Sequence, residues 1–269
     1  MPRVSIVLPT YNRAELIGRT IRGVLWQSYQ DWELIIVDDA STDGTEAVVK
    51  SFKDDRIRYI KLDKNTGGSF IPRTYGIEQA SGEYIAALDD DTCWTSKNKL
   101  KAQVDYLDAN PDCVLVGTNA CYSYNGRSRK YSMIFPSLDK DIRRKLLSKN
   151  CFLHPSVMFR RKDLTRVGGY MRFDGNPYLN YTSDYRLWLE LCRLGSAHNL
   201  GREMVYIILE EKNYSFLQRC RIILSIARML HDYKDSYPNY HRALLCWSTL
   251  LLDTIFFRKL KKTISGSGE

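Results

Sequence analysis

The sequence predicts an α/β protein with a mainly parallel sheet flanked by helices. The first half of the chain alternates short apolar runs with helical patterns, and this repetition favours parallel strands joined by right-handed crossovers. Two of the apolar runs end in carboxylates, at 38–39 and at 89–91. Because the carboxyl ends of parallel strands meet at one edge of a sheet, both acidic groups should lie at that edge, where such proteins bind ligands.

The N-terminal pattern predicts the first strand and the first helix. Val4–Leu8 is apolar and is typical of a buried strand, which should stop at Pro9. Asn12 is expected to cap the next helix, with Glu15 completing a capping box. The helix itself is predicted from one apolar stripe, formed by Ile17, Ile21, Val24 and Leu25.

The strand–helix pattern repeats as far as the acidic triplet. Leu34–Val37 predicts a second buried strand, and the turn at 41–45 should start another helix. Ile57–Leu62 alternates in the manner of a third strand. A helix is then expected over Arg73–Ala80, followed by a buried strand over Tyr84–Leu88.

The second half of the chain has weaker signals. A helix is predicted from about 97 to 109, where an Asn-Pro pair ends it. Val114–Gly117 predicts a strand that extends toward Tyr122–Tyr124, and Asn125-Gly126 is a turn signal. A further helix is expected over Tyr185–Leu194.

The composition is that of an ordinary globular protein with an excess of positive charge. The 269 residues are 44% hydrophobic and 26% charged, and the formal net charge is +9. This charge indicates an anionic partner, such as phosphate groups or an acidic membrane surface. The seven cysteines include no C-x-x-C pair, which favours a reducing cytoplasm over a disulfide framework. Because the N-terminus enters a strand at once, we expect no signal peptide.

The triplet Asp89-Asp90-Asp91 suits a divalent cation. Adjacent carboxylates repel one another, and oxygen ligands are preferred by hard ions such as Mg²⁺ or Mn²⁺ that also bind phosphate. A solvated acidic turn is the alternative for such a triplet. Arg73 could pair with phosphate or with a base carbonyl. The turn 65–68 lacks the glycine patterns of dinucleotide-binding and phosphate-binding loops.

These motifs together resemble the family 2 inverting glycosyltransferases of the GT-A fold. The resemblance covers roughly residues 3–210. The matching runs are Val4–Arg13, Val37–Thr45 and Gly82–Asp91 with Trp94.

The resemblance implies specific roles for the residues in these runs. The expected nucleotide contacts are Pro9, Thr10, Tyr11, Arg13, Asp38, Asp39, Gly68, Arg73, Asp89 and Asp90. Asp91 is expected to bind Mn²⁺ or Mg²⁺, with Asp89 and His154 as further ligands. A lone histidine such as His154 is also often a hydrogen-bonded structural residue. The usual Ala-Arg-Asn around the basic position is here Pro72-Arg73-Thr74.

Asp184 matches the catalytic acid of the resembled family. It would act as the general base that removes a proton from the acceptor hydroxyl in a single inverting displacement. Ser183 stands where the family usually has Glu. Asp is also a favoured helix cap, so Asp184 could cap the predicted helix, alone or in addition to catalysis.

The C-terminal part differs from the rest. We expect a glycosyltransferase domain over 1–210 and a helical extension over 211–269. Phe216–Tyr233 reads as a basic amphipathic helix, and the apolar run Ala243–Phe257 is too short to span a bilayer. The basic run Arg258–Lys262 follows it. Such helices could lie on an anionic membrane surface, pack on the catalytic domain or join a second subunit.

The expected function is metal-dependent transfer of a sugar from a nucleoside diphosphate sugar, most often a UDP-sugar, to a hydroxyl of a glycan or lipid-linked saccharide. The alternative is a protein on the same scaffold that binds a nucleotide-sugar without transferring it. Aromatic residues in the segments 122–135 and 173–182 are compatible with sugar stacking and also with ordinary packing. We expect a cytoplasmic protein and no nucleic-acid partner. A peripheral contact with the inner face of the cell membrane is an open alternative.

Overall fold

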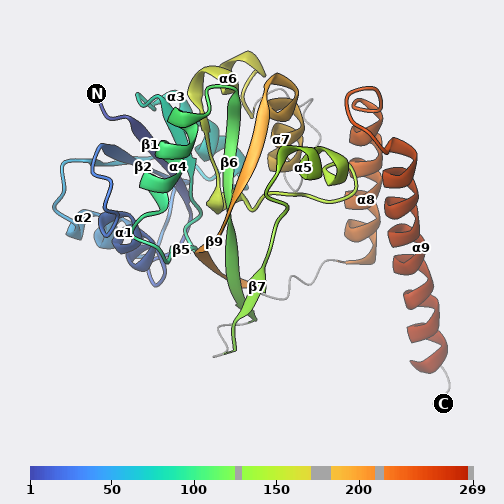
Figure 1. The fold of residues 1–269 in the computed structure, drawn as a ribbon. Helices are drawn as coiled ribbons and strands as arrows, with labels where there is room; N and C mark the ends of the chain where they lie inside the picture. The colour runs from blue at the N-terminus through green and yellow to red at the C-terminus, as the bar shows by residue number, and fades with distance from the viewer. Residues whose placement is uncertain (125–128, 171–182, 210–214, 266–269) are drawn as a thin grey trace.

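The computed structural model describes residues 1–124, 129–170, 183–209 and 215–265, with the side chains of the last helix described as far as 252. Its centre is one mixed sheet with the strand order β3-β2-β1-β4-β8-β6-β9-β5, and β7 pairs with β6 (Figure 1). The strands are β1 (Val4–Thr10), β2 (Trp32–Asp38), β3 (Ile57–Lys61), β4 (Tyr84–Ala87), β5 (Cys93–Trp94), β6 (Cys113–Tyr124), β7 (Tyr131–Met133), β8 (Met158–Arg160) and β9 (Ser196–Leu209).

The helices lie on both faces of this sheet. They are α1 (Ile17–Leu25), α2 (Thr45–Ser51), α3 (Phe70–Glu78), α4 (Lys99–Ala109), α5 (Asp139–Lys145), α6 (Arg161–Arg166), α7 (Ser183–Leu194), α8 (Phe216–His231) and α9 (Tyr240–Ser265). A short 3-10 helix, η1, covers His154–Ser156.

The parallel half of the sheet is the part that the sequence predicts. β3, β2, β1 and β4 are all parallel, so the residues after β2 and β4 meet at one edge. β8 then runs antiparallel to both β4 and β6, while β6 and β9 are parallel to each other. The expected parallel arrangement is thus confirmed for β3, β2, β1 and β4. The other half of the sheet contains both parallel and antiparallel pairs.

Two hydrophobic cores cover the two faces of the sheet. We call the face that packs against Ile17, Ile21 and Leu100 of α1 and α4 the α1 face. The opposite face, which packs against Tyr185 and Trp188 of α7, is the α7 face. Because side chains alternate along a strand, neighbouring strand residues belong to different cores.

Pro9 does not end the first strand, contrary to the sequence-based expectation. The carbonyl of Val7 accepts a hydrogen bond from the N–H of Leu88, on the side of β1 that faces β4. Pro9 lies two residues further on the same side, beyond the last pairing between Val7 and Ala87. Its missing N–H therefore leaves no bond of the sheet unmade, and β1 continues to Thr10 along β2.

The expected capping box at the first helix is also wrong. α1 begins at Ile17, and no side chain caps its N-terminus. Asn12 instead adopts a positive φ of 51° and its Oδ1 accepts a hydrogen bond from the N–H of Thr42, 2.8 Å away. Asn12 thus ties the loop after β1 to the loop after β2.

Other elements also differ from the predicted ones. α3 begins at Phe70 rather than Arg73, because Pro72 in its first turn lacks only an N–H that has no partner within a helix. The sequence patterns predict no counterpart of β5, β7, β8, β9, α5 or α6. The turn expected at Asn125-Gly126 lies outside the described residues.

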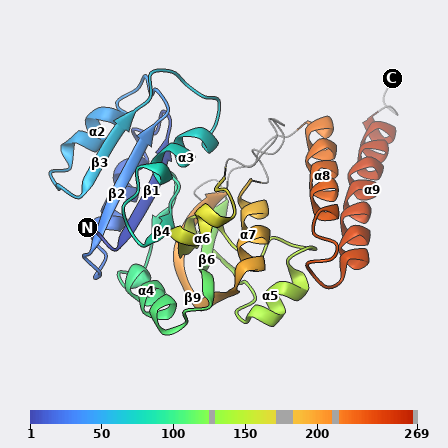
Figure 2. The same cartoon turned by 90° about the horizontal axis from the view of Figure 1, so that it is seen from above.

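Helices α8 and α9 lie side by side at one end of the molecule, next to α7 and α5 (Figure 2). The buried side chains Ile226 and Leu230 of α8 join the core on the α7 face. Trp247 of α9 donates from Nε1 to the carbonyl of Leu147, 2.9 Å away. Within the described residues, no helix is both long enough and apolar enough to cross a bilayer.

Candidate active site

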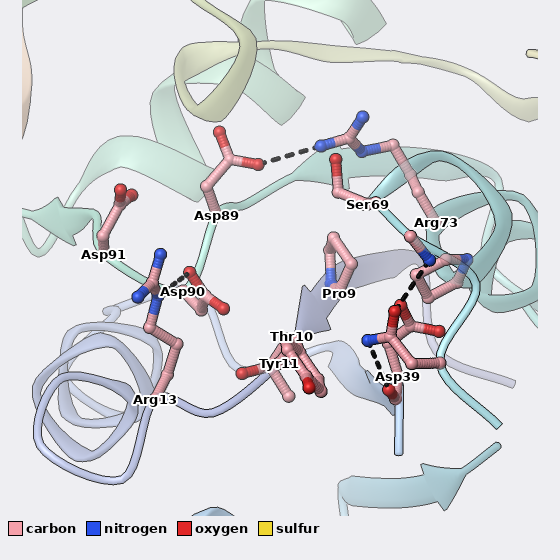
Figure 3. A pocket seen from close by; sticks show the side chains of 14 residues that line it. Pro9, Thr10, Tyr11, Arg13, Asp39, Ser69, Arg73, Asp89, Asp90 and Asp91 are labelled. Atoms are coloured by element: carbon pink, nitrogen blue, oxygen red, sulfur yellow. Dashed lines mark hydrogen bonds and ion pairs between the residues drawn. The ribbon is translucent and has the colours of Figure 1, made fainter. Parts of the chain in front are cut away.

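A cavity of about 540 Å³ opens where β1, β2 and β4 end, at the edge predicted from the acidic groups (Figure 3). Ten of the predicted site residues line it: Pro9, Thr10, Tyr11, Arg13, Asp39, Gly68, Arg73, Asp89, Asp90 and Asp91. Its other lining residues are Asn65, Gly67, Ser69 and Pro72. The structure therefore brings together residues that lie up to 82 positions apart, from Pro9 to Asp91.

Asp39 forms one wall of the cavity. Its backbone N–H donates to the carbonyl of Thr10 over 2.8 Å, which joins the ends of β1 and β2. Its carboxylate accepts the backbone N–H of Thr66 at 2.9 and 3.1 Å. A carboxylate fixed in this way can still accept a bond from a nucleobase N–H or a ribose hydroxyl, since each oxygen accepts more than one.

The acidic loop after β4 forms the opposite wall. The side chain of Arg13 pairs with Asp90 at 3.4 Å, and Figure 3 shows the two side by side. Arg19 of α1 donates from Nη2 to the carbonyl of Asp91 over 3.0 Å. The hydroxyl of Thr20 is 3.0 Å from the carbonyl of Asp90. The N-terminal half of α1 therefore fixes the backbone of this loop.

Asp89 is neutralised by the protein itself. Its carboxylate pairs with Nη2 of Arg73 at 3.1 Å and with Nδ1 of His154 at 3.2 Å. Burial alone would raise the pKa of Asp89, but His154 and Arg73 outweigh burial and hold that pKa well below its usual range. Asp89 is thus ionised and already paired.

Asp90 and Asp91 are poorly compensated by contrast. Burial and the charge of the neighbouring carboxylates raise the pKa of Asp90 to about 6, against the opposing effect of Arg13. Burial and Asp89 also raise the pKa of Asp91. Two acids held close together with too little positive charge are a place where a cation would bind favourably.

This arrangement fits a divalent cation that also binds a ligand. Among the described residues, no three His, Cys, Asp or Glu side chains are grouped so that they could hold a metal by themselves. Mg²⁺, however, commonly takes only one or two carboxylates and completes its shell with phosphate oxygens and water. The carboxylates of Asp91 and Asp90, facing the cavity, supply such ligands.

Three predicted site residues do not line the cavity: Asp38, His154 and Asp184. Asp38 is fully buried, and its two oxygens accept bonds from the Ser41 N–H at 2.7 Å and from the Tyr59 hydroxyl. Asp38 therefore supports the turn after β2. Because successive side chains point in opposite directions, Asp39 lines the cavity and Asp38 does not. Both ring nitrogens of His154 are also engaged, by Asp89 and by the hydroxyl of Tyr170, so neither is free to bind a metal in this structure.

Asp184 lies in the first turn of α7 and is not among the residues that line the cavity. Because α7 begins at Ser183, Asp184 lies inside the helix, and its Oδ1 accepts the N–H of the next residue, Tyr185, at 2.8 Å. Burial raises the pKa of Tyr170, and the charges of Asp184 and Asp89 add to that effect. Tyr170 therefore lies within the electrostatic reach of both carboxylates. The residues just before α7, 171–182, are outside the described part of the chain.

A family model described as "Glycosyl transferase family 2" matches residues 5–168, more than half of the chain. The chain belongs to glycosyl transferase family 2. The family predicted from the sequence is confirmed, and the matched region contains the whole cavity lining.

Relatives in the family cover this chain to different extents. WfgD of Escherichia coli, named a UDP-Glc:alpha-D-GlcNAc-diphosphoundecaprenol beta-1,3-glucosyltransferase, is 32% identical over 200 residues, which span 74% of each protein. TuaG of Bacillus subtilis (strain 168) is 41% identical over 108 residues, 39% of this chain and 42% of TuaG. WcaA of Escherichia coli (strain K12) is matched over 34% of its length. The chain thus spans less than half of TuaG and of WcaA.

Solved structures show the same fold at low sequence identity. TarS 1-349 of S. aureus superposes with a TM-score of 0.71 at 20% identity, covering 99% of this chain and 75% of that one. The mannosyltransferase PcManGT of Pyrobaculum calidifontis, in complex with GDP-Man and Mn²⁺, gives 0.67 at 20% identity, covering 100% and 76%. The GT-A fold with a helical C-terminal region is confirmed.

Two side chains at this family 2 site escaped the sequence analysis. Arg19 follows the matched Pro-Thr-Tyr-Asn run, and no pattern in the sequence indicates its contact with the acidic loop. Tyr170 follows a Gly-Gly pair and is almost fully buried. Its hydroxyl is hydrogen-bonded to Nε2 of His154, and no sequence pattern indicates that these two residues meet.

Proposed function

We propose that the chain transfers a sugar from a nucleoside diphosphate sugar to a hydroxyl of a lipid-linked saccharide, with inversion at the anomeric carbon. The observation that carries this proposal is the convergence of Asp39, Arg73 and the triplet Asp89–Asp91 on one cavity. A base-reading carboxylate, a cation and a metal-binding acidic loop are the three features that a nucleoside diphosphate requires.

A UDP-sugar is the first candidate donor. The related WfgD is named for UDP-Glc, and TarS has been crystallised with UDP and with UDP-GlcNAc. PcManGT was crystallised with GDP-Man. In this chain Asp39, Thr10 and Tyr11 would surround the base, and Arg73 would face the phosphates.

The proposed cofactor is Mn²⁺ or Mg²⁺, held by Asp91 with Asp90 beside it. A cation bound there would offset the negative charge that grows on the leaving diphosphate. Arg13 lies next to Asp90 and would add positive charge on the same side. Asp89, paired with Arg73 and His154, keeps the loop in place rather than binding the ion directly.

Asp184 is the proposed general base. Its carboxylate would take the proton from the acceptor hydroxyl while that oxygen forms a bond to the anomeric carbon. The bond from this carbon to the diphosphate oxygen breaks in the same step, and its electron pair leaves with the diphosphate. Attack from the face opposite the leaving group inverts the configuration.

We also propose the division into a transferase domain over 1–210 and a helical extension over 211–269. Part of the extension packs on the proposed transferase domain through α8, which supports the alternative in which the C-terminal helices pack on that domain. Five leucines on the other faces of α8 and α9 are exposed among the described side chains: Leu217, Leu224, Leu245, Leu250 and Leu252. Exposed leucines beside a basic run support a peripheral membrane contact near a lipid-linked acceptor.

The membrane contact has its own test. Leu224→Ser with Leu245→Ser should weaken sedimentation with vesicles that contain anionic lipid, while activity on a water-soluble acceptor stays unchanged. Equal sedimentation of the variant and the native protein at low salt would favour an oligomer contact instead.

The central experiment compares Asp184→Asn with the native protein. Transfer from a panel of UDP- and GDP-sugars to α-GlcNAc-diphosphate-decyl should fall by about 10²–10⁴-fold in the variant, as is typical for loss of a general base. Binding of UDP with Mn²⁺ should be unchanged. Asp105→Asn, an exposed acid on α4, is the matched control and should keep full activity.

NMR of the product linkage checks the stereochemistry. Retention of configuration, or near-normal turnover of Asp184→Asn, would remove Asp184 from this role. Donor binding without any transfer by the native protein would favour the alternative of a non-catalytic nucleotide-sugar-binding protein.

A further inference from the structure

A strip of side chains continues from the acidic loop across three strands of the sheet. Cys93 of β5, two positions after Asp91, pairs with Tyr206 of β9, and Tyr206 pairs in turn with Cys121 of β6. Residues paired across neighbouring strands point to the same face. We call Cys93, Tyr206, Cys121, Ser123 and Lys130 the Tyr206 strip.

The Tyr206 strip lies on the same face of the sheet as Asp184. The residues next to its members in sequence, Trp94, Val205 and Ala120, are buried in the core of the α1 face. Because strand side chains alternate, the strip must point to the α7 face. Helix α7, which carries Asp184, packs on that face.

The strip continues outward from the start of α7. Only Gly195 separates the end of α7 from β9, so the strand runs back along the helix. The 12 residues of α7 are about 18 Å long, whereas the stretch of β6 that pairs with Ser196–Tyr206, Cys113–Cys121, spans about 26 Å. Tyr206 therefore lies about 8 Å beyond the end of the helix at which Asp184 sits, a distance of about two sugar rings.

The side chains of the strip combine an aromatic ring with a cation. The hydroxyl of Tyr206 is hydrogen-bonded to Oγ of Ser123 at 2.7 Å, which fixes the ring. Nζ of the exposed Lys130 lies 5.0 Å from the centre of that ring. The exposed Glu203, whose partner across the strands is Asn119, is on the same face, nearer to α7.

This chemistry suits an anionic saccharide. The apolar face of a pyranose can pack on the Tyr206 ring, and Lys130 can pair with a phosphate or carboxylate next to it. A carboxylate such as Glu203 accepts bonds from sugar hydroxyls. All three groups are carried by strands or lie directly beside them, so they form a surface that needs little rearrangement to bind.

The opposite face of the same hairpin carries a matched pair of residues. The guanidinium of Arg129 lies 5.0 Å from the ring centre of Tyr131. Tyr131 pairs with Tyr122, which packs against the core of the α1 face, so this pair points away from Asp184. The two pairs are adjacent in sequence and similar in geometry, and they differ in the face they occupy.

We propose that the Tyr206 strip is the distal acceptor site, which holds an anionic group of the saccharide acceptor some sugar rings away from the hydroxyl that reacts. This rests on the proposed function for the reaction at Asp184. The anionic group is either the diphosphate of a lipid-linked sugar or an acidic sugar of the glycan itself. Lys130 pairs with the anionic group, and the ring of Tyr206 packs against a sugar ring next to it.

Binding measurements test the strip without relying on turnover. Three probes are titrated into the protein saturated with UDP and Mn²⁺: α-GlcNAc-diphosphate-decyl, a glucuronic acid–GlcNAc disaccharide and the neutral chitobiose. At least one anionic probe should bind more tightly than chitobiose. Lys130→Ala should remove this preference, and Tyr206→Leu should weaken the preferred probe about tenfold, whereas Tyr206→Phe should keep its affinity. The anionic probe that is preferred identifies the source of the charge.

The control variants are Arg129→Ala and Tyr131→Leu. Both should change the affinity for the preferred probe less than about twofold. In the transfer assay, Lys130→Ala should raise the acceptor KM and leave kcat and the hydrolysis of donor unchanged. The proposal is overturned if neither anionic probe exceeds chitobiose, if Lys130→Ala keeps the preference, or if Arg129→Ala weakens binding equally. Failure of the proposed function would look different, since no variant and no native protein would then transfer sugar.

Discussion

Nδ1 of His154 lies 3.3 Å from Oδ2 of Asp89, and Nε2 of the same ring lies 3.1 Å from the hydroxyl of Tyr170. The imidazole thus connects the acidic loop of the N-terminal half with a residue from the half that carries Asp184. It gives Asp89 a partner that comes from a different part of the chain than Arg73. The position of the acidic loop therefore depends on both halves of the molecule.

Tyr170→Phe should lower the free energy of unfolding by about 1–2 kcal/mol, because a buried ring nitrogen of His154 then loses its partner. Urea denaturation measures the change. Tyr75→Phe, at an exposed position on α3, is the control and should have no effect. If Tyr170→Phe were as stable as the native protein, the hydroxyl would contribute nothing to this connection.

Asp90→Asn should stabilise the ligand-free protein at pH 7.5. The pKa of Asp90 is raised to about 6 in the folded state, so between pH 4 and 6 the folded state binds more protons than the unfolded state. Stability is therefore lost as the pH rises through this window, by up to about 2–3 kcal/mol. Asparagine does not titrate, so the stability of the variant should not fall over this pH range. The difference in stability between the variant and the native protein should therefore disappear below about pH 4.

Thermal unfolding at pH 4, 6 and 7.5 checks this prediction for Asp90→Asn. Asp105→Asn on the exposed surface of α4 should follow the native protein at every pH. A stability difference that did not change with pH would mean that Asp90 is not the titrating group.

Asp91→Asn should make nucleotide binding independent of divalent metal. Loss of a carboxylate ligand should weaken UDP binding at least about tenfold in Mn²⁺, with little change in EDTA. Calorimetry in the two buffers measures both values. An unchanged response to EDTA in the variant would show that the ion is held elsewhere.

Asp39→Asn should alter the choice of nucleobase. Its amide oxygen can still accept the N–H of Thr66, so the fold should persist, while the acceptor pattern offered to the base changes. The ratio of the dissociation constants for UDP and GDP should shift by about tenfold, as measured by calorimetry. Asp38→Asn is the contrast, since this buried acid should affect stability and leave the ratio unchanged.

Lys99→Met should remove a pH dependence of stability. Lys99 is completely buried, donates to Oε1 of Gln103 at 2.7 Å and lies 4.1 Å from the centre of the Trp94 ring. Burial lowers its pKa well below the usual value, so above that pKa the folded state holds the lysine neutral while the unfolded chain binds a proton up to about pH 10. Native stability should therefore rise with pH, by at most about 1.4 kcal/mol per unit.

Urea titrations at pH 7, 8 and 9 compare the native protein with Lys99→Met. The difference between them should grow in favour of the native protein as the pH rises. Parallel curves would mean that Lys99 keeps its proton when buried.

The first half of the fold and most of the cavity could be predicted because their signals are local. β1, β2 and β4 are mainly apolar runs and β3 alternates, and the acids follow the apolar runs of β2 and β4 directly. Local signals do not predict which of two adjacent acids faces the cavity. Asp38 and Asp39 are equivalent in the sequence, and only the backbone direction at the end of β2 sends one into the turn and the other into the cavity.

The second half was harder to predict because its elements depend on distant partners. β9 is interrupted by the exposed run Gly201-Arg202-Glu203, and its pairing with β6 contains irregularities, so its sequence does not alternate cleanly. It is a strand because β6 and β5 pair with it on either side. Asp184 was found through the family motif and not through any local pattern.

The insertion of β9 between β5 and β6 has a consequence for the order of events during synthesis. β5 follows the acidic loop by a single residue and pairs with β9, which emerges from the ribosome about a hundred residues later. The parallel strands β1 to β4 can form while the nascent chain is still short. The Asp90–Asp91 end of the cavity, which the start of α1 already holds, gains the support of β9 only once residue 206 is available. A ribosome-bound chain that stops before β9 should therefore bind the proposed nucleotide less tightly, even though the wall formed by Asp39 is complete.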